Sequence, residues 1–337
     1  MALLLVLWVL AVLTVIVAEF CRTMRTEVGI AYNYKEMTQA SYSARAGVQM
    51  ALLQIIRTIA APSAALTGDS PGEASKIDWR LNTDIPATGP YEGRITIRID
   101  NEGGKVNINL ADHMLLRLAV SGLDLTEDEE SVIVDSIMDW RDRDGTRRLN
   151  GAENEYYRSL ATPYVCKNDD FDSISELLLV RGVTSEIFFG KLSERVTVYP
   201  SRKTAEKKLG LKPGSTKIAG GFDFNKINVN AAPPDLLLAL PEFDEDMVKA
   251  IIAYRQEKDL GASNELVSLI GPKAYLPSRS YLDFKLSPYY KVTAFGEIGE
   301  GRVKQGVSAV VRVDLKSKEK YYTVQWNANV DDPGRMG

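Results

Sequence analysis

Oxygen-bearing side chains are concentrated between residues 139 and 170, in the stretch DWRDRDGTRRLNGAENEYYRSLATPYVCKNDD. Carboxylates and amides at this density are the hard donors that suit Ca²⁺, which takes roughly six to eight oxygen ligands. We interpret six of these side chains as candidate ligands of a structural calcium ion: Asp139, Asp142, Asp144, Glu153, Asn168 and Asp170.

The spacing of Asp142 and Asp144 is that of the start of an EF-hand loop, but the Gly and the bidentate Glu that such a loop requires do not follow. The loop 145–168 would have to close on itself to bring Asn168 back beside them. The same stretch contains arginines that could balance its charge internally: Arg141, Arg143, Arg147 and Arg148. From the residues alone, a calcium site and a solvated acidic loop both remain open.

Catalytic chemistry has little support in the sequence. The only histidine, His113, lies at the start of an apolar helix-forming stretch. No specific nucleophile–base set, Gly-rich phosphate loop or cysteine-pair metal motif can be assembled. The two cysteines, Cys21 and Cys166, are too few for a disulfide scaffold. We therefore expect no enzymatic activity.

The elements that must carry the acidic loop begin with a long helix. From Met1 to Ala61 there is no proline, so one helix of about 60 residues and about 90 Å is predicted over 1–60. Its uncharged part, 1–18, is long enough to cross a bilayer core. Its remainder, 19–60, is amphipathic, with a half-exposed stalk followed by a part that packs on a domain.

Two simpler interpretations of this start remain open. A cleaved signal peptide is one, although nothing basic precedes the apolar run, and an ordinary membrane anchor is the other. The charges that follow the run do not settle its orientation, since Arg22 and Arg25 are interleaved with Glu19 and Glu27.

The rest of the chain is predicted to be α+β, with a split antiparallel sheet. Strands are expected within 93–109, and period-2 alternation after 289 predicts a three-stranded meander. The sheet domain is thus formed by 61–110 and 289–330, and a helical domain, 111–288, is inserted in it. We expect a loop at 61–75, and a protease-sensitive loop at 200–215, PSRKTAEKKLGLKPGS.

An internal repeat runs through the insertion, over 104–199 and 225–296. GKVNINLADHMLLRLAVSG (104–122) resembles NKINVNAAPPDLLLALPE (225–242), and each begins with a strand that carries alternate asparagines. Each unit is expected to continue through helices to a return strand, at 197–200 and at 289–296.

The repeats have the pattern of helix-hairpin-helix DNA modules. The alternative function is therefore a membrane-anchored DNA-binding protein of a DNA-uptake system. Such hairpins hold phosphate with a Gly-rich turn and adjacent basic residues. Here the turns VSGLDLTEDEES, LPEFDEDM and VRGVTSE are acidic, and the net charge of the chain is −4. We expect the hairpin fold without nucleic-acid binding.

These features together resemble a known family. An apolar first helix that continues into a globular head is the plan of type IV pilins and type II secretion pseudopilins. The motifs VNIN, WRDRDG, NGAENEYYRSL, PYVCKN, FDSISELLLVRGV and INVNAAP resemble the general secretion pathway protein K family, the large minor pseudopilins, across essentially the whole chain. The resemblance implies a type IV pilin-like fold with an inserted helical domain that binds structural Ca²⁺.

The resemblance also bears on the first residues. It implies that Met1 is the N-terminus left by prepilin peptidase and then methylated; a retained initiator Met is the alternative. Most pilins carry a glutamate at the fifth position, where this chain, like family K, has Leu5. A carboxylate buried in an apolar bundle needs a partner from the subunit ahead, which a tip subunit lacks. Taken alone, Leu5 is one more leucine of the apolar run.

The implied function is a non-catalytic structural role at the tip of the pseudopilus. The implied partners are minor pseudopilins of the I, J and H types, the prepilin peptidase and the inner-membrane assembly platform. The implied location is the bacterial inner membrane, with the globular domain in the periplasm.

Overall fold

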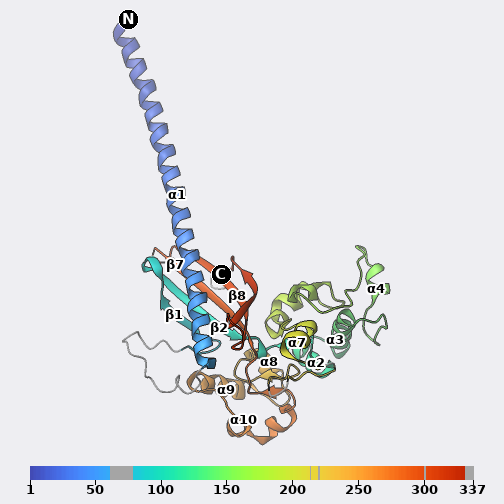
Figure 1. The fold of residues 1–337 in the computed structure, drawn as a ribbon. Coiled ribbons are helices and arrows are strands. Elements are labelled where there is room, and N and C mark those ends of the chain that lie inside the picture. The colour runs from blue at the N-terminus through green and yellow to red at the C-terminus, as the bar shows by residue number, and fades with distance from the viewer. Residues whose placement is uncertain (61–78, 213, 219–220, 300, 331–337) are drawn as a thin grey trace, which may run out of the picture.

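The computed structural model describes residues 1–60, 79–212, 214–218, 221–299 and 301–330. Helix α1 runs unbroken from Ala2 to Ala60, as predicted. Residues 1–35 are exposed, and burial begins at Glu36. The helix therefore projects far beyond the rest of the chain (Figure 1), and its first part is long and apolar enough to cross a membrane.

Five antiparallel strands form the main sheet, in the order β1-β2-β7-β8-β9. They are β1 Asp84–Thr88, β2 Arg94–Asn101, β7 Tyr289–Ile298, β8 Val303–Val313 and β9 Tyr321–Asn327. The last three are the predicted meander, and β2 is the predicted earlier strand. The long helix with this sheet and the mixed content of helix and strand give the expected α+β, pilin-like arrangement.

The second half of α1 packs on one face of this sheet. Alternate apolar residues of β2, β7 and β8 meet one face of the helix, which carries Ala44, Val48, Ala51, Leu52 and Ile55. The approach is closest at Gly296 of β7, where a Cβ atom would lie 2.2 Å from the Ala40 carbonyl oxygen. Small residues on both surfaces therefore fix the position of the helix on the sheet.

Between β2 and β7 the chain is mostly helical. The α-helices are α2 His113–Val120, α3 Glu127–Arg141, α4 Asn154–Arg158, α5 Ser185–Ile187, α6 Ser193–Arg195, α7 Arg202–Leu209, α8 Pro234–Leu238, α9 Glu245–Glu257 and α10 Ser263–Ser278. Shorter helical elements in the same stretch are η2 Glu102–Gly104, η3 Ile174–Leu179 and the π-helical η4 Phe188–Leu192, while η1 Pro90–Glu92 lies between β1 and β2. The larger helices share a hydrophobic core that is separate from the core under α1. In Figure 1 they lie beside and below the sheet, away from the projecting end of α1.

Two segments of this region differ from the simplest expectation. The segment 200–215, where proteolysis is predicted, contains α7, whose buried Ala205 packs in a small cluster with Leu211 and Phe222. The segment 289–296 is not a return strand of the second repeat, because it forms β7 of the main sheet. The predicted loop 61–75 lies outside the described residues.

Two short parallel pairs of strands join the helices. Strand β3 Val106–Asn107 pairs with β4 Val196–Thr197, and β5 Ile227–Asn228 pairs with β6 Leu282–Asp283. The first pair lies where the return strand was predicted, although β4 shares only Thr197 with the predicted span 197–200. In the second pair, β6 is the return strand, a role that was predicted for 289–296.

The turn after each first strand is held by an asparagine. Asn109 Nδ2 donates to the Phe171 carbonyl at 3.0 Å, and its Oδ1 accepts the Phe171 N–H at 2.7 Å. Asn230 makes the same two bonds with Leu260, at 2.9 and 2.8 Å. Asn109 and Asn230 thus each link the first strand of one half of the helical region to a segment that follows the second helix of the same half.

An arginine supports each turn from the helix side. Arg141 at the end of α3 and Arg255 near the end of α9 each donate to two carbonyls of the turn. The carbonyls belong to Ile108 and Ala111, and to Val229 and Ala232. The two halves of the helical region therefore use the same contacts at corresponding positions.

Candidate metal site

The acidic loop leaves the end of α3, which is anchored at both ends. Thr126 and Glu129 form a capping box at its start. Near its other end, the buried Trp140 packs edge-on against Tyr157, with ring centroids 5.2 Å apart. Because Tyr157 belongs to α4, this contact closes the loop and returns the chain after residue 150 to the end of α3.

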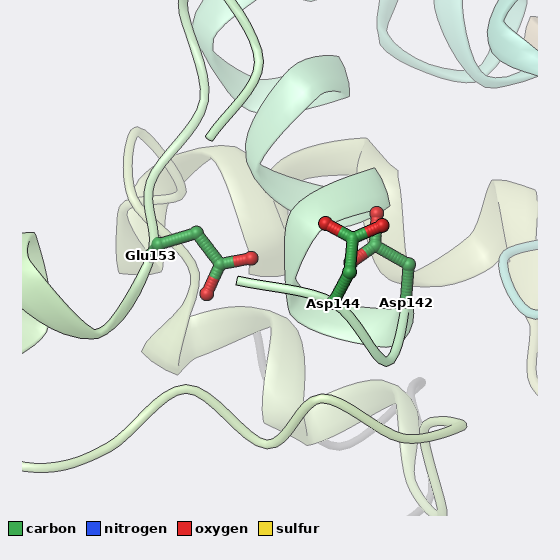
Figure 2. A group of neighbouring side chains, drawn as sticks. All are labelled: Asp142, Asp144 and Glu153. Atoms are coloured by element: carbon green, nitrogen blue, oxygen red, sulfur yellow. The ribbon is translucent and has the colours of Figure 1, made fainter. Parts of the chain in front are cut away.

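Three of the predicted ligands converge where this loop closes. Asp142, Asp144 and Glu153 each offer a carboxylate oxygen, and these atoms lie within 4.8 Å of one another. Figure 2 shows the Glu153 carboxylate pointing across to the two aspartates. Asp142 is the C-cap of α3 and Glu153 is the N-cap of α4, so the ends of two helices position the group.

Several oxygens of this group are buried without a partner. Among the described residues, Asp142 Oδ1 and both carboxylate oxygens of Glu153 accept no hydrogen bond, and neither does Asn168 Oδ1. Asn168 reaches the same place, because its Nδ2 donates to the Asp144 carbonyl at 3.1 Å. An unsatisfied buried polar group costs about 1–3 kcal/mol, and more when it is charged. Converging oxygens of this kind fit a cation with oxygen ligands.

The pKa values of two acidic groups, Glu153 and Asp139, are raised. Burial, with the nearby charges of Asp139 and Asp142, raises the pKa of Glu153 above its ordinary value. Burial also raises the pKa of Asp139, although Arg148 opposes this shift. The ionised form of Glu153 is therefore disfavoured by desolvation and by repulsion, and a bound cation would relieve both.

The remaining predicted ligands, Asp139 and Asp170, have protein partners. Arg148 Nη1 lies 2.6 Å from Asp139 Oδ1 and 2.5 Å from Asp142 Oδ2, so one guanidinium bridges two carboxylates. Asp170 Oδ2 accepts the backbone N–H of Lys203, near the start of α7, at 3.3 Å. The structure thus groups four of the six predicted residues and gives these two other contacts.

Sequence reasoning does not single out two residues that shape the site. Arg148 is one of five arginines between residues 139 and 170, and nothing in its spacing marks it as the one that bridges Asp139 and Asp142. Gly151 passes so close to Asp139 that a Cβ atom would lie 2.0 Å from its Oδ2. Both roles depend on how the loop closes, which no local pattern encodes.

Met1 and Leu5 lie at the exposed end of α1. The Leu5 N–H donates to the Met1 carbonyl at 3.3 Å, and the Leu5 side chain is 66% exposed. Any packing partner of Leu5 must therefore come from outside the described chain.

Comparisons with known proteins agree on one family. A family model described as type II secretion system (T2SS), protein K, matches residues 101–201. Type II secretion system protein K of Aeromonas hydrophila is 25% identical over 330 residues, which is 90% of each chain. The protein of the same name from Pectobacterium carotovorum subsp. carotovorum is 32% identical over 90 residues, 27% of each chain.

A solved structure has a similar fold. It is a chain from the crystal structure of the GspK-GspI-GspJ complex of the enterotoxigenic Escherichia coli type 2 secretion system. The TM-score is 0.52 with 14% identity, and the match covers 86% of this chain and 98% of the other. At this identity the likeness concerns the fold.

Proposed function

We propose that this chain, which belongs to the family of type II secretion system protein K, is a non-catalytic structural subunit at the tip of the type II secretion pseudopilus. In that position it would help to initiate pseudopilus assembly and the export of folded proteins across the outer membrane. The observation that carries the proposal is the exposed apolar half of α1, continuous with a pilin-like head. Such a helix needs partners outside its own chain, first a bilayer and then other subunits.

Leu5 supports the tip position. A glutamate there would be neutralised by the N-terminal amine of the subunit ahead, and a subunit at the tip has no neighbour ahead. An apolar residue avoids leaving an unpaired charge in an apolar bundle.

The proposed partners follow from the same position. The similar E. coli chain was crystallised in a complex of GspK, GspI and GspJ, so we propose I- and J-type pseudopilins as direct partners, with an H-type subunit next in the filament. We propose prepilin peptidase and the inner-membrane platform as its processing and assembly partners. The globular part would lie in the periplasm.

DNA binding is not favoured. The first turn of α3, where a helix-hairpin-helix module would meet a phosphate, carries four acidic residues: Glu127, Asp128, Glu129 and Glu130. These negative charges repel phosphate, and they already interact favourably with the positive end of the helix dipole.

We further propose that 111–288 is an inserted domain with two helix-hairpin-helix-like repeats. The separate core of this region supports an independent folding unit. The matched asparagine and arginine contacts, at Asn109 and Asn230 and at Arg141 and Arg255, support a common origin of its halves.

We propose that Asp142, Asp144, Glu153 and Asn168 bind a structural Ca²⁺, with Asp139 and Asp170 beside them. The ion would supply positive charge that ties the loop to the end of α3. Binding to the folded state alone adds about 2.7 kcal/mol when the ion is at about 100 times its dissociation constant. The melting temperature should therefore rise with Ca²⁺ and less with Mg²⁺; an identical melting curve in metal-free protein with and without Ca²⁺ would contradict the site.

The tip position can be tested on isolated pseudopili. Antibody against the globular part should label one end of each filament in electron micrographs. The control is antibody against the major pseudopilin, which should label the whole length. Labelling of this subunit along the filament would contradict the tip position but leave its membership of the pseudopilus intact.

A further inference from the structure

A cavity of about 430 Å³ lies between the end of α3 and the start of α7. This volume is in the range of ordinary small-ligand pockets, roughly 300–1,000 Å³. Its lining includes five cationic side chains: Arg141, Arg143, Arg148, Arg202 and Lys203. Four carboxylates also line it: Asp142, Asp169, Asp170 and Glu206.

Most of these carboxylates already have partners. Arg148 binds Asp142, and Lys203 forms an ion pair with Asp169. Asp170 accepts the N–H of Lys203 in the first turn of α7. Two of the five cations are therefore engaged with carboxylates of the lining.

The other three cations are guanidinium groups that form no ion pair with a carboxylate among the described residues, although Asp169 lies near enough to Arg143 to feel its charge. In the part of the chain that the structure describes, Arg141 donates to the Ile108 and Ala111 carbonyls and Arg202 only to the Asn109 carbonyl, at 3.4 Å. Arg143 has no hydrogen bond or ion pair within that part. Burial and the like charges of Arg202 and Arg148 lower the pKa of Arg141 to about 10. The carboxylates of Asp170 and Asp142 oppose this shift only in part, and the five cations of the lining exceed its four carboxylates by one charge.

We propose that this cavity binds a carboxylate or phosphate group, held by the guanidinium groups of Arg143 and Arg202. A guanidinium presents planar pairs of N–H donors that match the oxygens of both groups, and such charge-assisted bonds are stronger than neutral ones. Arg202 is half-buried and set at the start of α7, whereas Arg143 is exposed at the rim. In this proposal Arg202 binds the ligand inside the cavity, and Arg143 binds it from the exposed side.

The two sources of such a group are a free anion and an acidic side chain of another protein. The test uses the full chain in neutral detergent micelles, freed of metal with a chelator that is then dialysed away, because a chelator is itself a polycarboxylate. Without metal, the result does not depend on the calcium proposal. Inorganic phosphate and the blocked dipeptide acetyl-Asp-Glu-amide are titrated by calorimetry at low salt and again at higher salt.

At least one probe should bind, and added salt should weaken the binding. Arg202→Gln and Arg143→Gln should each raise the dissociation constant about tenfold, a loss of one charge-assisted contact. Arg147→Gln removes the same charge from an exposed position of the same loop outside the cavity, so it should leave the constant unchanged. Tighter binding of phosphate would identify a free anion, and tighter binding of the dipeptide an acidic side chain.

Two outcomes would overturn the proposal. One is the absence of a binding isotherm for both probes at millimolar concentration. The other is an equal loss of affinity in Arg147→Gln, which would mean only general attraction to a basic surface. If Arg202→Gln fails to fold, the exposed Arg143→Gln still decides the question.

Discussion

Among the described residues, Glu153 differs from Asp139 and Asp142 because its carboxylate forms no ion pair. Its side chain is buried, and within the described residues both of its oxygens accept no hydrogen bond. Arg148 serves as an internal counter-ion for Asp139 and Asp142, but within the described residues it forms no ion pair with Glu153. A single arginine therefore neutralises one side of the acidic group and leaves the other side to an external cation.

The first prediction separates the effect of this charge from that of calcium. Glu153→Gln should leave metal-free protein as stable or more stable, because it removes a buried unpaired charge. The same change should remove most of the stabilisation by Ca²⁺, because the amide is a weaker ligand. Melting temperatures with and without millimolar Ca²⁺ measure both effects. Glu155→Gln, an exposed neighbour, should change neither, and equal behaviour of the two variants would contradict the role of Glu153.

A second prediction concerns pH. The pKa of Glu153 is raised in the folded, metal-free protein, so the folded state keeps this proton to a higher pH than the unfolded state does. The group then destabilises the fold increasingly as pH rises from its ordinary value of 4.5 through the raised one. In metal-free protein, the melting temperature of Glu153→Gln minus that of the parent should therefore increase from about pH 4 to about pH 7. A difference that shrinks over this range would contradict the direction of the shift.

At the scale of elements, the contact between α1 and the sheet depends on glycine. A Cβ at Gly296 would lie 2.2 Å from the Ala40 carbonyl oxygen, which is backbone and cannot move aside without shifting the helix. We predict that Gly296→Ala destabilises the protein by about 1–3 kcal/mol, as overpacking does. Denaturant unfolding of the full chain in micelles measures this.

Gly29→Ala is the matched control. No atom lies within 4 Å of a Cβ at Gly29, which sits in the exposed part of α1. The change should leave unfolding of the head unaltered and favour the helix by about 1 kcal/mol. A loss of stability equal to that of Gly296→Ala would mean that the close approach at Gly296 is not the cause.

Elements with a strong period were predictable, and those defined by distant contacts were not. Helix α1 has no proline before its end, and β7, β8 and β9 alternate clearly. Strand β1 contains Pro86, which argues against a strand unless the strand lies at a sheet edge, as this one does. Helix α7 is basic, and only the packing of its Ala205 in the cluster with Leu211 and Phe222 shows which side is buried. Strand β6 has two residues, too few for any period.

The candidate site likewise has features that the sequence predicts and features that depend on contacts between distant residues. The density of acidic residues identified the loop, because ligand type is a property of composition. The edge-on packing of Trp140 on Tyr157 decides which of those residues meet, and this is a contact between separate elements. The role of Gly151 follows from that closure and has no signature of its own in the sequence.

At the scale of the whole molecule, the acidic loop and the apolar end of α1 lie far apart. In Figure 1 the N-terminus lies at the top, at the far end of α1, whereas α4 lies at the right, beyond the sheet. We therefore predict that removal of Ca²⁺ speeds amide hydrogen exchange in 142–168 and leaves β7 and β8 unchanged, since exchange reports local opening. Mass spectrometry of peptides from both regions measures this. Faster exchange across the main sheet would instead mean that the ion stabilises the molecule as a unit.

The last prediction concerns assembly through α1. Met24 is 43% exposed and belongs to none of the hydrophobic clusters of the described residues, so Met24→Glu should leave the melting temperature unchanged. It should, however, weaken co-purification with the I- and J-type subunits, because a charge placed in an apolar helix contact is desolvated without a partner.

Thr26→Glu adds the same charge about 200° around the helix, away from Met24. It should therefore disturb assembly less. Since neither substitution reaches the sheet or the acidic loop, a difference between the two would locate the contact on one face of the stalk. Complexes retained equally by both variants would show that the Met24 face does not carry the contact, and the proposed tip complex would then have to form through the globular part.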